Sequence, residues 1–406
     1  MIKSYRIMLL PNNKQLTRLN ETANAARYAY NWTVGKQIEA FSETGKYIKE
    51  TELRKAFTIH KKENLWLYSI SNDATKQAIK DACAAFWRFV DKKKKRDYKP
   101  FNKRKIIRAT EKRFKLGRYD MLHHPKFKKK NKARPKFYVD CEKIKFTKTH
   151  AILEKIATST RKKRANQIRL AEKERVPFGV KYVNPRVTSD GLNFWISVGV
   201  ETKIAAKKAT NAGIGVDVGI NKLAVVSNGE TYRNINKDKK VRKLKKRKRR
   251  LQRGVSRKYE KKGERSEKTK NIIKREKKLL KLELRLTGIR RNHAHQATNK
   301  IIKRKPSFIT VEDLNIQGMM KNRHLSRALQ EQSLYEFSRQ LEYKSALNGI
   351  EFRKANRFFP SSKICSICGN KKLDLKLNDR IYKCECGNDM DRDLNAAINL
   401  MRYTAR

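Results

Sequence analysis

The sequence has few acidic residues, few cysteines and no long apolar run. Only 39 of its 406 residues are Asp or Glu, whereas 102 are Lys or Arg, so the formal net charge is +63. No stretch comes near the roughly 18 apolar residues that a membrane helix needs, and the four consecutive apolar residues near the start are too few for a signal peptide. Six cysteines in a chain of this length make no disulfide framework. These absences exclude membrane-spanning and disulfide-stabilised proteins, and we expect a cytoplasmic one.

Lys and Arg are spread along the whole chain and not confined to a tail. A compact protein with this charge repels itself, and a large polyanion would relieve the repulsion. Enzymes acting on small acidic metabolites are largely excluded, because such substrates could not use so much charge. We therefore expect nucleic acid to run through or around the folded body. A ribosomal protein is an alternative for any basic chain, but this length and the candidate catalytic segments fit it poorly.

The N-terminal half contains strand and helix signals in turn. Residues 2–9 predict a strand, and apolar residues then recur at helical spacing from residue 14 to about residue 90. Residues 136–200 return to strand signals, with turns predicted at Asn184-Pro185 and at Ser189-Asp190-Gly191. We expect a small barrel or open sheet that includes the N-terminal strand.

Two kinds of segment could contact nucleic acid. Five aromatic residues in the helical region either fill a helix-bundle core or stack on bases: Tyr28, Tyr30, Trp32, Trp66 and Trp87. Residues 91–135 mix basic and aromatic residues, and residues 237–250 hold eleven Lys or Arg in fourteen positions. Each basic segment is either a solvated face or a phosphate contact, and we predict phosphate contact by Lys103, Arg104, Lys105, Lys245, Lys246, Arg247, Lys248, Arg249 and Arg250.

The C-terminal half predicts strands that carry acids and helices between them. The expected elements are a strand–turn–strand at 213–230, a basic helical hairpin at 237–300, a strand at 308–316, and helices at 326–348 and 391–403. Asp217 lies in an apolar strand, where a lone carboxylate is costly to bury unless it is paired or binds a metal. Glu312 ends a second apolar strand and Asp393 begins the last helix.

Each of these acids also has an ordinary explanation. Asp217 could close a hairpin, Glu312 could be solvated, and an Asp at a helix start is good capping chemistry. Together they make a stronger case, because metal-dependent phosphodiester cleavage needs carboxylates that converge from different segments. Mg²⁺ prefers hard oxygen ligands and keeps several waters, so few protein ligands suffice. Two strands and a C-terminal helix can supply them in a ribonuclease H-like arrangement.

Asp391 and Asp393 require a choice. Asp391 stands at the predicted N-cap, and Asp393 is about 200° further around a helix at ~100° per residue. We therefore predict that Asp391 caps the helix, that Asp393 supplies the third ligand, and that the two do not face the same site.

Four cysteines form two short pairs, Cys365/Cys368 and Cys384/Cys386, separated by 15 residues. This spacing is a strong zinc-ribbon signal, and four thiolates favour a structural site over a catalytic one. The second pair is one residue shorter than the usual knuckle. Free cysteines in a loop are the weaker alternative.

The chain resembles TnpB, a family of transposon-encoded relatives of the type V CRISPR nucleases. The resemblance rests on YRIMLLPNNKQ, ARYAYNW and YKPFNKRK near the start, and on GIGVDVGINKLAVVSNG, ITVEDLNI, LEYKSALNGIEF, FPSSKICSICG and DRDLNAAINL later. It covers nearly the whole length. By motif match, the acids Asp217, Glu312 and Asp393 take the family's catalytic positions, and the four cysteines take its zinc positions.

The resemblance implies a multidomain α+β fold. The N-terminal half is expected to form a wedge β-barrel at 1–13 and 121–208, into which a helical recognition lobe at 14–120 is inserted. The C-terminal half is expected to form a RuvC-type, RNase H-like nuclease domain at 209–360 and 389–406. That domain carries a basic helical insertion at about 234–300 and a zinc-ribbon insertion at 361–388. It further implies RNA-guided cleavage of double-stranded DNA beside a short adjacent motif. Mg (or Mn) and Zn are the expected metals, a guide RNA from the transposon end is the expected partner, and a monomeric ribonucleoprotein in a prokaryotic nucleoid is the expected state.

Three other functions compete with this one. A nuclease-inactive, RNA-guided DNA-binding repressor would use the same scaffold, but the intact acids argue against it. An RNA-binding structural protein would have purely structural acids. A transposase proper would need a strand-transfer activity or a nucleophilic Tyr, and the order Asp, Glu, Asp differs from the Asp, Asp, Glu of the common transposases.

Overall fold

The structure is a computed structural model that describes residues 2–97, 125–130, 133–156, 166–202, 212–262, 268–376 and 379–404. The chain divides into two compact units, residues 2–202 and residues 203–406, which are described separately. Lys103, Arg104 and Lys105 lie outside the described residues, so their phosphate contacts stay predictions. No described helix has the length and apolar character to cross a membrane.

The first unit contains a seven-stranded antiparallel sheet in the order β2-β6-β7-β1-β5-β4-β3. Its strands are β1 (Ile2–Leu10), β2 (Lys136–Tyr138), β3 (Lys145–Phe146), β4 (His150–Ile152), β5 (Gln167–Leu170), β6 (Tyr182–Ser189) and β7 (Phe194–Glu201). The N-terminal strand pairs with β7 from Ile2 opposite Glu201 to Leu9 opposite Phe194. The prediction that the N-terminal strand joins the later strands is therefore confirmed.

One predicted turn in this sheet is wrong. Asn184-Pro185 lies inside β6, where the pairing with β7 shifts register between Val183 and Arg186. Pro has no N–H to donate to a ladder, and Asn184 has a φ of +49°, so the two residues form a bulge within the strand. The second predicted turn is confirmed, since Asp190 N donates to Asn193 O and Gly191 has a φ of +96°.

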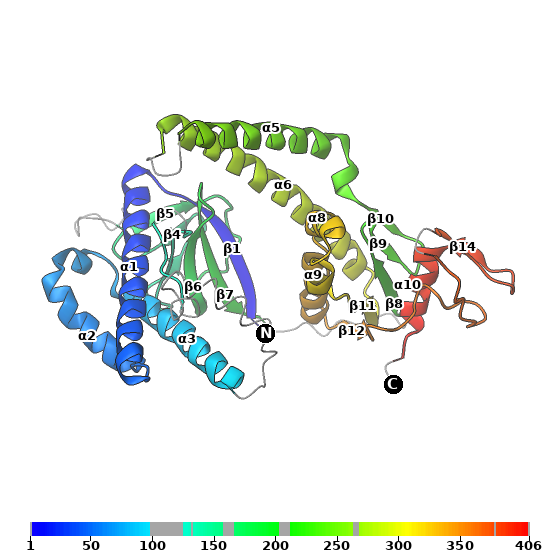
Figure 1. Ribbon diagram of the computed structural model, residues 1–406, viewed down its shortest axis with the longest axis horizontal. Helices are drawn as coiled ribbons and strands as arrows, with labels where there is room; N and C mark the ends of the chain where they lie inside the picture. Colours follow the sequence, from blue (N-terminus) through cyan, green and yellow to red (C-terminus); the bar gives the residue numbers. More distant parts are fainter. Residues whose placement is uncertain are drawn as a thin grey trace, which may run out of the picture. The chain divides into compact units, whose positions relative to one another are not determined.

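Helices α1 (Asn13–Thr44), α2 (Glu50–Glu63) and α3 (Asn72–Asp97) complete the first unit, with a short 3₁₀ helix η1 (Leu65–Ser69) between α2 and α3 (Figure 1). Asn12 and Gln15 form a capping box at the start of α1, each side chain accepting from the other's backbone N–H. Gly45 ends α1 at a φ of +67°. The helices and the sheet share one apolar core, so the periodic apolar residues found in the sequence are mostly buried.

The second unit contains a five-stranded sheet in the order β10-β9-β8-β11-β12. Its strands are β8 (Ile214–Val218), β9 (Lys222–Val226), β10 (Thr231–Arg233), β11 (Phe308–Glu312) and β12 (Glu351–Ala355), and a separate pair comprises β13 (Ile381–Lys383) and β14 (Asp389–Asp391). The first three strands form an antiparallel meander, whereas β11 runs parallel to both β8 and β12. Two parallel neighbours thus end at the same edge of the sheet.

The helices of this unit are η3 (Ile235–Lys237), α5 (Lys239–Lys262), α6 (Lys270–Lys303), α7 (Ile316–Met319), α8 (Arg323–Gln332), α9 (Leu334–Leu347) and α10 (Arg392–Arg402). The two long basic helices α5 and α6 lie side by side, as predicted (Figure 1). The predicted helix at 326–348 is instead two helices, because Ser333 adopts a left-handed φ of +58° between them. Apolar residues of α6 and α9 pack on one face of the sheet and α10 covers the other.

Candidate functional site

Asp217 and Glu312 lie in matching positions on adjacent strands. Val216 of β8 pairs with Val311 of β11 in parallel register, so the next residue along each strand is one of the two acids. Val216 and Val311 belong to the core on the α6 and α9 side. Because side chains alternate along a strand, both carboxylates face the α10 side of the sheet. The exposed neighbour Asp313 pairs instead with Arg357, 2.7 Å away, as expected of a residue that points outward.

Gly215 allows α10 to approach this edge. A Cβ built on Gly215 would lie 2.0 Å from Ala397 O and 2.4 Å from Met401 N, both backbone atoms of α10. No side chain fits there, so the glycine two residues before Asp217 sets the spacing between strand and helix. Asp393 lies one helical turn before Ala397 and is thereby brought toward Asp217.

Asp391 is the N-cap of α10, as predicted. Its Oδ1 accepts from Asp393 N at 2.9 Å and from Leu394 N at 3.2 Å. The expectation that Asp391 and Asp393 face different sites is wrong, because Lys222 Nζ lies 2.7 Å from Asp391 Oδ2 and 3.9 Å from Asp393 Oδ2. The prediction assumed that both residues follow the helical rotation of ~100° per residue. Asp391 is the cap residue, has a ψ of 127° and is not yet helical, so this rotation does not apply to it.

The negative charges of these acids act on Asp217. Burial, followed by the negative charges of Asp393 and Glu312, raises the pKa of Asp217 to about 7. Burial also raises the pKa of Glu312, with a smaller contribution from Asp313. Burial acts in the same direction at Asp391, but the Lys222 ammonium and the N–H groups of α10 hold the pKa of Asp391 below its usual range. The edge of the sheet therefore concentrates negative charge that Lys222 only partly offsets.

This donor set fits a divalent cation that keeps water ligands. Carboxylate oxygens from two strands and a helix are the ligand type that Mg²⁺ prefers. The carboxylates are less tightly gathered than the cysteines: among the described residues, the cysteines alone form a group of three or more potential ligands with all ligand atoms within 4.8 Å. Asp217, Glu312 and Asp393 would hold such a cation, and water could fill its remaining ligand positions.

Cys365, Cys368, Cys384 and Cys386 converge despite the shortened second pair. The Cys365 and Cys386 Sγ atoms are 3.6 Å apart, as are those of Cys368 and Cys384. Each pair is followed by a glycine with positive φ, +79° at Gly369 and +85° at Gly387. Burial acts to raise the pKa of the Cys365 thiol, but backbone N–H groups and Asn388 Nδ2 lower it to about 6. Thiolate-stabilising donors around four gathered sulfurs fit a structural zinc ion.

Buried asparagines join residues 361–368, the knuckle that carries Cys365 and Cys368, to α10. This feature was not predicted from the sequence. Asn395 Oδ1 accepts from Ser366 N at 2.9 Å, and Asn395 Nδ2 donates to Ile364 O at 2.7 Å. Asn399 Nδ2 donates to Ile364 O and to Ser361 O. Asn388 Nδ2 donates to Cys365 Sγ at 3.2 Å. Asn395 and Asn399 lie four residues apart on one face of α10, although Asn is a poor helix former. This spacing could have indicated that the two side chains have partners outside the helix.

The basic face of α5 is divided into paired and unpaired residues. Lys245 pairs with Glu331 and Lys248 with Glu283, at 2.5 and 3.0 Å. Within the described part of the chain, the four other predicted contact residues of this helix are exposed and have no carboxylate within ion-pair range: Lys246, Arg247, Arg249 and Arg250. Of the six predicted contact residues on α5, these four can meet a polyanion without breaking a described ion pair.

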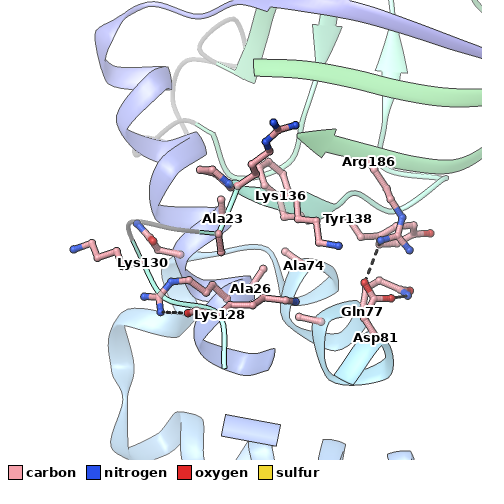
Figure 2. A pocket seen from close by; sticks show the side chains of 17 residues that line it. Ala23, Ala26, Ala74, Gln77, Asp81, Lys128, Lys130, Lys136, Tyr138 and Arg186 are labelled. Atoms are coloured by element: carbon pink, nitrogen blue, oxygen red, sulfur yellow. Dashed lines mark hydrogen bonds and ion pairs between the residues drawn. The ribbon is translucent and has the colours of Figure 1, made fainter. Parts of the chain in front are cut away.

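A small basic pocket of about 50 Å³ lies in the first unit, between α1, α3 and β2 (Figure 2). Lys128 Nζ lies 3.0 Å from the centre of the Tyr30 ring, and burial lowers the pKa of Lys128 to about 8. Arg186 pairs with Asp81 at 3.1 Å across the pocket. Cations outnumber acids among the lining residues, which include Arg27, Lys128, Lys130, Arg134, Lys136 and Arg186.

Three family models match the chain. Residues 1–46 match a "Helix-turn-helix domain", residues 195–323 match "Probable transposase", and residues 335–400 match "Cas12f1-like, TNB domain". The last match includes all four cysteines, and the second includes Asp217 and Glu312.

Curated relatives align over nearly the full length and are provisionally named RNA-guided DNA endonucleases. One from Streptomyces pristinaespiralis is 27% identical over 98% of this chain and 88% of that protein. InsQ of Escherichia coli K12 is 24% identical over 98% of this chain and 92% of that protein. A protein of Mycobacterium tuberculosis is 26% identical over 99% of this chain and 86% of that protein.

Two solved structures are similar at a lower level. A Cas12f1–sgRNA–target DNA complex has a TM-score of 0.35 at 13% identity and covers 99% of each chain. The mini RNA-guided endonuclease CRISPR-Cas_phi3 has a TM-score of 0.43 at 9% identity and covers 99% of this chain and 92% of that one. In its sequence motifs, its three family-model matches and its relatives of matching length, the chain is similar to the TnpB family.

Proposed function

We propose that this chain is a transposon-encoded, RNA-guided DNA endonuclease that hydrolyses phosphodiester bonds with Mg²⁺ or Mn²⁺ at Asp217, Glu312 and Asp393. The observation that carries the proposal is the parallel register of Asp217 and Glu312 beneath the start of α10. The names of the curated relatives support the guided endonuclease activity. On this proposal the five-stranded sheet and α10 are a RuvC-type nuclease domain of the RNase H-like class, and the first unit comprises the wedge barrel and the recognition lobe.

Each acid has a distinct task on this proposal. Asp217 and Glu312 present oxygen ligands from two strands whose spacing is fixed by the sheet, and Asp393 closes the site from the helix. A divalent ion held there would lower the pKa of a bound water and stabilise negative charge on the scissile phosphate. Lys222 holds Asp391 and leaves Asp393 at the longer distance of 3.9 Å, so Asp393 can turn to a cation without breaking the cap.

The cysteines would hold zinc as a structural ion. A four-thiolate site has no open position for a substrate, so its contribution is to fix a segment that has almost no core of its own. The asparagine contacts extend this support to α10 and hence to Asp393.

RNA and DNA are the proposed partners, and a monomeric ribonucleoprotein is the proposed state. Guide pairing delegates base reading to RNA, so the protein mainly has to hold backbones. The exposed cations of α5 and the basic pocket of the first unit suit that task, because phosphate contacts supply affinity without sequence information.

The decisive experiment compares cleavage and binding in one ribonucleoprotein. Asp217→Ala should abolish cleavage of a guide-matched plasmid in Mg²⁺ and leave RNA and DNA binding near normal, because the change removes a ligand and no backbone contact. Asp313→Ala is the matched control, an exposed carboxylate beside Glu312, and should cut normally. Cleavage retained by Asp217→Ala would reject the assignment, and a wild-type particle that binds without cutting would favour the nuclease-inactive repressor.

A further inference from the structure

The short helix η1 exposes large apolar side chains to solvent. Leu65, Trp66 and Tyr68 are 73%, 48% and 50% exposed, whereas Leu67 between them is 1% exposed and anchors the turn. Two cations fix the backbone around them. Lys155 Nζ donates to Tyr68 O at 3.0 Å, and Arg18 Nη2 donates to Ser69 O at 2.7 Å. The exposed side chains are thus presented on a fixed turn.

An aromatic ladder supports the Trp66 ring from the interior. Trp66 meets the Tyr28 ring edge-on, with centroids 5.6 Å apart, and Tyr28 stacks on His60 at 5.9 Å. The Tyr28 hydroxyl also hydrogen-bonds His60 Nε2 at 2.7 Å. A ring that is held on one side and open on the other can stack with a planar ligand at little further cost in conformational entropy.

A groove of about 180 Å³ lies between α2 and α3, the helices that η1 connects. Its charged lining consists of Arg54, Lys55, Lys61 and Lys76, and none of the described residues that line it is acidic. Lys61 is only 7% exposed and its Nζ donates to the neutral Asn72 Oδ1 at 2.5 Å. Burial, then the nearby charges of Lys155 and Lys76, lowers the pKa of Lys61, so the groove holds more positive charge than the protein compensates.

Asp73 and Glu50, which act on cations of this groove, already form ion pairs. Asp73 acts to raise the pKa of Lys61 against the larger effect of burial, and its carboxylate pairs with Lys143 at 2.6 Å. Glu50 pairs with Arg54 at 3.4 Å. An incoming anion would therefore meet Lys61 and Lys76 without displacing a carboxylate from either.

We propose that the α2–η1–α3 segment binds unpaired RNA, with a backbone phosphate in the groove and a base stacked on Trp66. A cationic groove and an aromatic platform on the same segment are the combination that binds single-stranded nucleic acid. RNA is the occupant because folded RNA exposes unstacked bases in its loops, and proteins bind such bases on aromatic side chains. This inference rests on the proposed function, which supplies the RNA. An acidic peptide would use the groove but would leave the platform unexplained.

The test uses the ribonucleoprotein as it is purified. Trp66 should be protected from chemical oxidation in the particle and become reactive after RNase treatment, and photo-crosslinking should attach an RNA base to the peptide that contains Trp66. Trp87 is the control, because it is 52% exposed on α3 and outside η1. Trp66→Ala should weaken RNA binding by roughly fivefold to a hundredfold, the range of one lost base stack, whereas Trp66→Phe should restore most of it.

A second measurement separates stacking from misfolding. Replacing the crosslinked nucleotide by an abasic one should weaken binding to the wild type as much as Trp66→Ala does, with no additional loss when both changes are combined. Lys76→Gln should weaken binding of the intact RNA and of the RNA with the abasic nucleotide by the same factor. Equal Trp66 oxidation with and without RNA would overturn the proposal, and a crosslink to target DNA alone would overturn the choice of RNA. Protection that survives RNase would point to protein contact instead. None of these readouts requires DNA cleavage, so a failure of the nuclease assignment would be seen separately.

Discussion

Replacing Asn395 by alanine should weaken binding at the proposed zinc site, although Asn395 is not one of its proposed ligands. The change removes the acceptor of Ser366 N and one of two donors to Ile364 O, while Asn399 Nδ2 still donates to Ile364 O at 2.7 Å. Ser366 is 3% exposed, so its N–H would be left buried and unpaired. Such a group costs about 1–3 kcal/mol, and the lost donor adds roughly 1 kcal/mol.

This cost falls on the segment that positions Cys365 and Cys368. If most of it appears as weaker zinc binding, 2 kcal/mol corresponds to about a thirtyfold loss of affinity, which lies within the usual effect of residues behind the ligands. The assay is competition for zinc with a chromophoric chelator, followed by the melting temperature and the cleavage rate of the same preparation. We expect zinc affinity and cleavage to fall together.

Asn399→Ala is the matched control on the same helix. It leaves Ser361 O without this donor, but Ile364 O keeps Asn395, so no buried N–H is orphaned. Its effect on zinc should be smaller. Wild-type zinc affinity in Asn395→Ala, or a larger loss in Asn399→Ala, would refute the idea that these contacts couple the knuckle to α10.

The second unit supports three further predictions. Asp217→Asn should raise the melting temperature of metal-free protein at neutral pH. The folded pKa of Asp217 is about 7 against an ordinary value of 3.8, so its contribution to stability is present below pH 4 and lost as the pH rises toward 7, by up to about 4 kcal/mol. Melting curves in EDTA that do not diverge between pH 4 and pH 7 would contradict this. Lys246, Arg247, Arg249 and Arg250 can be replaced together by Gln. The slope of log binding constant against log salt concentration should then become shallower by about one for each phosphate that is no longer neutralised. Lys245→Gln with Lys248→Gln is the control and should mainly lower stability, because both side chains form internal ion pairs. If the fourfold variant kept the wild-type salt slope, its four side chains would be a solvated face and not a phosphate contact. Asp393→Ala should fold and bind DNA but not cut, whereas Asp391→Ala should lose ~1 kcal/mol through its cap and keep measurable cleavage; the reverse result would make Asp391 the ligand.

The sequence allowed the prediction of features that depend on local pattern. The cap at Asp391 is set by its neighbours in the chain, and the structure contains it. The two strands carrying Asp217 and Glu312 were also predictable, because each is a short apolar run that ends near an acid.

Features that depend on distant partners could not be predicted. Lys245 and Lys246 look alike in the sequence, but only Lys245 meets Glu331, 86 residues away. Lys222 gave no signal because its partner Asp391 is 169 residues away. The break at Ser333 was also missed, because a left-handed serine within a continuous apolar periodicity leaves no local trace.

The close contact at Gly215 also bears on when the protein can act during its own synthesis. A ribosome completes β8 and β11 long before α10, whose first residue is Arg392. Until α10 emerges, the helix that lies against Gly215 is missing, and Asp393 is missing with it. A chain this basic can collect RNA while it is still being made, yet the proposed nuclease edge stays incomplete until the closing helix docks. Nascent chains would thus bind nucleic acid before they can cut it.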